Sequence, residues 1–245
     1  MSGSSPLAAF RRAAQPAEEA RALARIGREP DLQRTMDQFR KAVERAPDVK
    51  AALRDPRVLS VLGKALGIPE AATQPGLASR ALLSDLKDDK SVANRLSDRR
   101  WKEAAASLKL DTGGVAALRD AKVQATLLDG LKRARWREQL NEQTPGLGDA
   151  LEFSERAGRV RTSLDVLGDA VMRRVVTGAL GLPQQIAIQS VEAQARAVDS
   201  RLKVEKLQNP AEARRIAERY LITQVGTSNA ATANTSLLAK YGYSV

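Results

Sequence analysis

Residues 53–69 read LRDPRVLSVLGKALGIP, and this stretch carries the start, the interior and the end of one helix. Asp55 can accept hydrogen bonds from the free backbone N–H groups at a helix start, and Pro56 suits the first helical position. Apolar residues fill the interior, and Gly67 followed by Pro69 is typical of a helix end. The segment therefore predicts a short helix that buries an apolar stripe.

The same pattern recurs 114 residues later, where residues 167–183 read LGDAVMRRVVTGALGLP. Seven of the 17 aligned positions are identical, among them the capping Asp, the Gly that ends the helix and the final Pro. Caps and buried stripes can converge for physical reasons, but the alignment has no gap. We therefore expect two weakly repeated halves, at about 29–115 and 116–223; two copies with so long a period do not make a solenoid.

The rest of the chain also predicts helices. Ala, Leu, Arg, Lys, Gln and Glu, which are strong helix formers, fill most of it, and no alternating run long enough for a strand stands out. Leu32, Met36, Phe39 and Val43 recur at helical spacing, and this stripe would face either the chain's own core or a partner's helix. The expected fold class is all-α, with several helices in an elongated or two-lobed domain.

Turn and loop residues divide the chain into three parts. We expect a flexible leader with one short helix at 1–28, a helical domain at 29–223 and a flexible tail at 224–245. Within the helical domain, a long amphipathic helix is expected to present Ala187, Val191, Ala195, Val198 and Leu202 on one face.

The composition excludes most familiar catalytic sites. The chain has no Cys and no His, so it has no thiolate or imidazole ligand for a metal, and no Ser-His-Asp or Cys-His nucleophilic site. A carboxylate enzyme would need a cleft that gathers two acids, and no spacing predicts one. We expect a protein that is not an enzyme and that uses no cofactor.

No stretch approaches the roughly 20 apolar residues of a membrane span. The first residues, MSGSSP, lack the basic and apolar regions of a cleaved signal peptide. The expected location is the cytoplasm.

A net charge of +11 favours anionic partners such as nucleic acid, acidic proteins or a lipid surface. Two basic clusters each contain a tryptophan, which could stack on bases while the cations hold phosphates. The simpler interpretation is an amphipathic helix that buries Trp beneath arginine stems. The candidate anion-binding residues are Arg99, Arg100, Lys132, Arg133, Arg135 and Arg137.

Several ordered blocks resemble a bacterial family known as the domain of unknown function 1217 family. They include EPDLQR at 29–34, DPRVL at 55–59, ANRLSDRRW at 93–101 and NEQTPGL at 141–147. The similarity continues through ALGLP at 179–183 and spans about residues 29 to 223. This sequence has Val92 and Leu108 where the family commonly shows Phe.

Members of that family are often encoded among flagellar genes, so the resemblance implies a flagellum-associated role and no catalytic residue. We therefore expect a structural, assembly or regulatory protein of the flagellum that contacts protein partners through its helices. The resemblance also implies a second possible location, the bacterial flagellum, reached by export without a cleaved signal peptide. The alternative is a basic anion-binding module, most plausibly for nucleic acid. The candidate docking segment is the apolar end of the tail, with Leu237, Leu238, Tyr241 and Tyr243.

Overall fold

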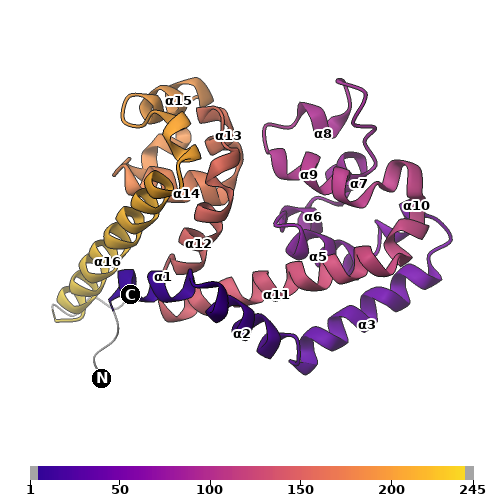
Figure 1. Ribbon diagram of the computed structural model, residues 1–245. Helices are drawn as coiled ribbons and strands as arrows, with labels where there is room; N and C mark the ends of the chain where they lie inside the picture. The colour runs from indigo at the N-terminus through magenta and orange to yellow at the C-terminus, as the bar shows by residue number, and fades with distance from the viewer. Residues whose placement is uncertain (1–4, 241–245) are drawn as a thin grey trace. The chain divides into compact units, whose positions relative to one another are not determined.

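The computed structural model describes residues 5–240, with the backbone alone at 184, 225 and 227–240. The described residues form sixteen α-helices and three short 3-10 helices and contain no strand (Figure 1), so the all-α prediction is confirmed. None of the described helices is long and apolar enough to cross a membrane.

The chain forms two compact units. The central unit consists of Ala17–Trp136, and the terminal unit consists of the described parts of Met1–Pro16 and Arg137–Val245. The long helix α11 (Ala121–Gln143) contains the boundary between Trp136 and Arg137. This division does not test the predicted repeat.

The central unit contains most of the shorter helices. In chain order they are α2 (Pro16–Ile26), α3 (Pro30–Arg45), α4 (Val49–Ala52), α5 (Pro56–Ala65), α6 (Glu70–Thr73), α7 (Pro75–Leu82), α8 (Val92–Arg95), α9 (Arg99–Leu108) and α10 (Leu110–Arg119). Helix α3 packs on α5 and α10. Its apolar stripe, from Leu32 to Val43, is buried within this chain, which settles the alternative of a partner's helix.

The terminal unit is built on a long C-terminal helix. Its elements are α1 (Pro6–Ala13), α12 (Leu147–Arg156), η1 (Ala157–Arg159), α13 (Ser163–Gly168), α14 (Ala170–Ala179), η2 (Gln184–Ile188), α15 (Val191–Asp199), η3 (Val204–Gln208) and α16 (Pro210–Lys240). Helix α16 packs against α14, α12 and α1. The apolar sides of these helices meet in the core of the unit.

The two similar segments adopt the same local geometry. Asp55 starts α5 by accepting the N–H of Arg57, and Asp169 starts α14 by accepting the N–H groups of Val171 and Met172. Both helices end in a glycine with positive φ, 70° at Gly67 and 62° at Gly181. After each glycine, the next N–H bonds the carbonyl five residues earlier, at 2.8 Å and 2.9 Å, as in a Schellman motif.

Some expected boundaries differ from the structure. The long helix expected through Ala187 and Leu202 is interrupted, because Ser190 accepts the N–H of Ala193 and starts α15 as a separate helix. The leader contains two helices, α1 and α2, and α16 continues through the first part of the expected tail to Lys240.

Candidate functional site

The first basic cluster has both buried and exposed members. The Arg100 side chain is only 5% exposed, and its guanidinium donates to both oxygens of Asp98 and to the carbonyl of Gly67. Trp101 is buried and cannot stack on a base. Of the two candidate anion-binding residues in this cluster, Arg99 is exposed and Arg100 is buried. The structure thus favours the amphipathic-helix interpretation here.

The second cluster lies on α11, and its members in the central unit are all paired with carboxylates. Trp136 beside them is 6% exposed. Such pairing leaves less positive charge for an external anion. The pairs are Lys132 with Asp129 at 2.9 Å, Arg133 with Glu19 at 3.1 Å and Arg135 with Glu29 at 3.7 Å.

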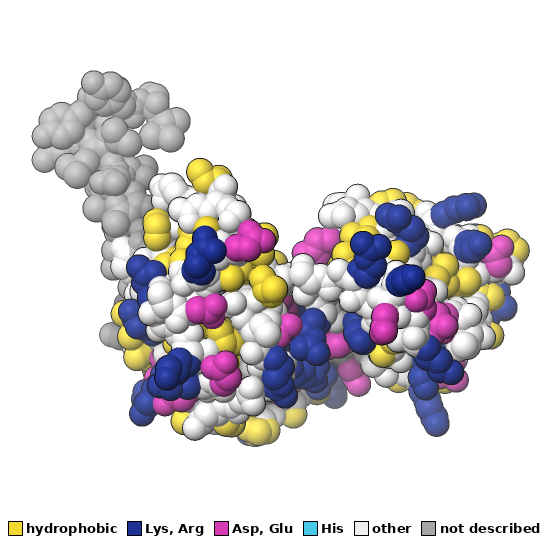
Figure 2. Space-filling model, turned by 90° about the horizontal axis from the view of Figure 1, so that it is seen from above, with side chains coloured by type: hydrophobic (Ala, Val, Ile, Leu, Met, Phe, Trp, Pro, Cys, Tyr) yellow, Lys and Arg dark blue, Asp and Glu magenta, His cyan; other side chains and the backbone are white. Residues whose placement is uncertain are grey.

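Arg137 follows on the same helix but belongs to the terminal unit. Its guanidinium lies 3.2 Å from Glu152 and 2.5 Å from Glu155. The structure therefore does not place the six candidate cations in one unit. On the face drawn in Figure 2, Lys and Arg side chains of each unit are interspersed with Asp and Glu side chains.

The predicted docking segment lies at the edge of the described chain. Leu237 and Leu238 are in α16, but their side chains are outside the described residues. Tyr241 and Tyr243 are outside them altogether. The segment stays a prediction.

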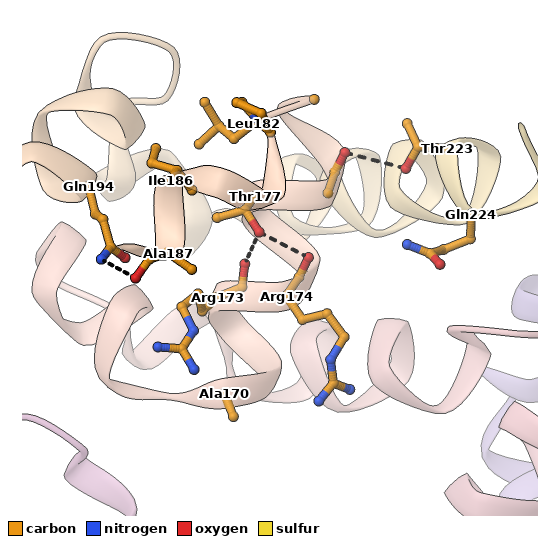
Figure 3. A pocket seen from close by; sticks show the side chains of 13 residues that line it. Ala170, Arg173, Arg174, Thr177, Leu182, Ile186, Ala187, Gln194, Thr223 and Gln224 are labelled. Carbon is orange, nitrogen blue, oxygen red and sulfur yellow. Dashed lines mark hydrogen bonds between the residues drawn. The ribbon is translucent and has the colours of Figure 1, made fainter. Parts of the chain in front are cut away.

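A groove of about 630 Å³ in the terminal unit is the best candidate site (Figure 3). Its lining residues belong to α14, to the turn after α14, to η2, to α15 (the buried Gln194) and to α16. Arg173 and Arg174 lie on one side in this view, and Leu182 and Ile186 lie on the other. Among the described residues that line the groove, two are cations and none carries a carboxylate.

The wall formed by η2 and the start of α15 is held by Gln194. This buried side chain donates to the carbonyl of Gln189 at 2.8 Å and to that of Ala187 at 3.5 Å (Figure 3). Next to this wall, Ile188 is 89% exposed and Val191 is 51% exposed. Large apolar side chains left in water beside a groove are typical of a protein-binding surface.

The floor of the groove is the close approach of α14 to α16 at Gly178. A Cβ atom there would lie 2.7 Å from the ring of Tyr220, so only glycine allows this approach. Thr223 also lies at this contact: its hydroxyl is 2.7 Å from the carbonyl of Tyr220 in its own helix and 3.3 Å from the carbonyl of Gly178. Gly146, with a φ of 82°, lies on another side of the same ring, where a Cβ atom would be 2.8 Å away.

Asp149 joins this core to the groove. Its carboxylate forms an ion pair with Arg174 and accepts the hydroxyl of Tyr220 at 3.4 Å. Asp149 thus fixes one cation of the groove and shares its charge. Arg173, in contrast, is exposed and forms no ion pair within the described part of the chain.

The buried hydroxyl of Tyr220 should make the stability of the terminal unit depend on pH. Burial, and then the negative charge of Asp149, raise the pKa of Tyr220 above its ordinary value. The neutral phenol is therefore favoured in the folded state, and its contribution to stability is present below about pH 10 and is lost as the pH rises above that value. We expect Tyr220→Phe to lose less stability than the wild type between about pH 9 and pH 11.

Urea denaturation followed by circular dichroism at the two pH values measures this difference. Lysines and the remaining tyrosines titrate in both proteins, so they cancel in the comparison. Equal losses of stability in the two proteins would contradict the assignment.

Comparison with known proteins places the chain in a family. The family described as "Protein of unknown function (DUF1217)" matches residues 65–213, which is more than half of the chain. The chain belongs to this family. The matched region includes α14, the turn after α14 that lines the groove, and α15. It ends within the first turn of α16. A comparison with curated proteins finds no match.

A solved structure shares the fold. The crystal structure of a structural-genomics target protein from Agrobacterium tumefaciens is similar to this chain with a TM-score of 0.70 and 23% sequence identity. The similarity covers 88% of this chain and 91% of that chain. The two proteins therefore share a fold over most of their length.

The DUF1217 blocks have structural roles. In NEQTPGL, Asn141 accepts the N–H of Gly148 at 2.7 Å and fixes the turn into α12, and Gly146 leaves room for Tyr220. In ANRLSDRRW, Asn94 donates to the carbonyls of Leu86 and Asp88 and holds the preceding loop.

Sequence reasoning missed the cations and the apolar wall of the groove. Arg173 and Arg174 sit within the second of the two similar segments, where the alignment drew attention to the shared residues instead. One signal was present: Gly181-Leu182-Pro183 ends α14, and a turn there forces the chain away from the helix and can leave a hollow beside it.

Proposed function

We propose that this protein is a non-enzymatic component of the bacterial flagellum that binds a protein partner through the groove of its terminal unit. The observation that carries the binding role is the groove itself, with exposed Ile188 and Val191 next to an apolar wall. The resemblance noted from the sequence supports the flagellar setting. The residues that the structure describes contain no group of three Asp or Glu side chains placed to hold a metal ion.

The nucleic-acid alternative has less support. Lys132, Arg133 and Arg135 are all paired with carboxylates of the chain, and both tryptophans are buried. A gel-shift titration at two salt concentrations tests it, since phosphate contacts make binding weaken steeply with salt. Binding at low salt that is lost at higher salt would favour this alternative.

Deletion of the gene tests the flagellar role. In a flagellated host we expect a clear loss of swimming in soft agar, restored by the wild-type gene in trans. Electron microscopy of the mutant cells would then show whether filaments are absent or present but inactive. Normal swimming and normal filaments in the deletion strain would contradict the proposal.

A further inference from the structure

The two similar helix ends differ in what covers them. In the central unit the turn after α5 is closed by the chain itself: Ile68 is fully buried, and Arg100 donates to the carbonyl of Gly67. In the terminal unit the corresponding Leu182 is partly exposed and lines the groove. The turn that follows the helix is therefore covered by the chain in the central unit and left partly exposed in the terminal unit.

The groove beside the exposed turn of the terminal unit should prefer a negatively charged ligand. Arg173 is exposed and forms no ion pair among the described residues, and Arg174 shares its charge with Asp149 alone among the described ion pairs. With no carboxylate in its described lining, the groove offers positive charge at one side and apolar surface at the other. The net charge of +11 adds attraction for an acidic partner at longer range.

We infer that the groove binds a short acidic segment of a partner protein, whose carboxylates pair with Arg173 and whose apolar side chains pack on the partly exposed Leu182. This inference rests on the proposed function, because it names the partner chemistry of the same groove. Carboxylates complement the guanidinium groups, and apolar side chains would remove Leu182 from water. Gln194 keeps the wall in place for this contact.

A library of random dodecapeptides displayed on phage and selected on the full chain tests the inference. Clones are sorted by their binding to two variants, Arg173→Glu and Arg214→Glu. Arg214 is an exposed arginine of the same unit that does not line the groove. Both substitutions lower the net charge equally, so the comparison separates the groove from general attraction of a basic protein for acidic peptides. Circular dichroism checks that each variant is folded.

We expect the clones that are lost on Arg173→Glu but kept on Arg214→Glu to be acidic and to contain spaced apolar residues. Synthetic copies should bind about tenfold more weakly to Arg173→Glu and within about twofold of wild type to Arg214→Glu. Leu182→Ser should weaken the same peptides, because it removes apolar surface and leaves the charge unchanged.

Three results would overturn the inference: groove-dependent clones that are neutral or basic, acidic clones that lose equal binding on both variants, or no groove-dependent clone at all. The outcome is separate from that of the gene deletion. Acidic peptides in the groove of a protein whose deletion leaves swimming normal would refute the flagellar role alone. A non-swimming deletion strain without such peptides would refute the partner chemistry alone.

Discussion

Replacing Gly130 with Ala is expected to lower the free energy of unfolding of the central unit by about 2–3 kcal/mol. Gly130 lies in α11, where alanine would ordinarily favour the helix by about 1 kcal/mol. Its Cβ atom, however, would lie 2.2 Å from the carbonyl oxygen of Ala65 and 2.9 Å from the carbonyl carbon. Because these are backbone atoms at the end of α5, no side chain can rotate away, and the two helices would have to separate.

Urea denaturation followed by tryptophan fluorescence measures this effect. Trp101 and Trp136 are both buried in the central unit, so their emission reports the unfolding of that unit. Gly76→Ala is the matched control, since Gly76 lies in a helix of the same unit and a Cβ atom there meets nothing within 4 Å. It should be neutral or stabilising by less than about 1 kcal/mol.

A second comparison separates the backbone contact from a loss of helix formation. Ala65→Gly combined with Gly130→Ala should not restore stability, because the carbonyl of residue 65 stays where it is. If Gly130→Ala were as stable as the wild type, or if the double variant recovered fully, the close approach of α11 to α5 would be wrong.

The local features of this fold could be predicted because their causes are local. Asp55 and Asp169 were placed at helix starts and Gly67 and Gly181 at helix ends, and the structure has them there. Capping depends on a few neighbouring backbone groups, and positive φ depends on the glycine itself. Both causes can be identified in a single sequence without knowing what packs against the helix.

The groove could not be predicted in the same way, because its floor depends on contacts distant in sequence. Thr223 bonds the carbonyl of Gly178, and Tyr220 packs against that glycine, more than forty residues along the chain. No periodicity within α14 or α16 indicates which helices meet or at which residue. The pairing of Arg137 with Glu152 and Glu155 depends on the same kind of contact between distant parts of the chain.

Arg100 shows a case in which a local signal was available. Arg100, Ala104 and Leu108 follow one another at a spacing of four residues, and all three are buried on one face of α9. The basic run around Trp101 allows both interpretations, of which the amphipathic helix is the simpler, and helical spacing places Arg100 itself on the buried face. Arg100, one of the six candidate anion-binding residues, is a buried partner of Asp98.

Arg100→Met is accordingly expected to destabilise the central unit by about 3 kcal/mol. Methionine keeps much of the volume but removes the guanidinium donor of the Gly67 carbonyl and of the Asp98 carboxylate, which then keeps the backbone N–H of residue 100 as a donor. Arg100→Lys should recover less than half of the loss, because one ammonium group cannot reproduce the two-pronged contact with Asp98. Tryptophan fluorescence in urea again gives the measurement.

Arg99→Met is the control, and it also decides between the two interpretations of this cluster. Arg99 is the adjacent, exposed cation, so its replacement should change stability by less than about 1 kcal/mol. If the cluster served nucleic acid, both variants would weaken binding at low salt, and Arg100→Met would do so while remaining as stable as the wild type. A large loss of stability confined to the Arg100 variants would instead show that this cation supports the end of α5, where the carbonyl of Gly67 needs a donor from within the chain.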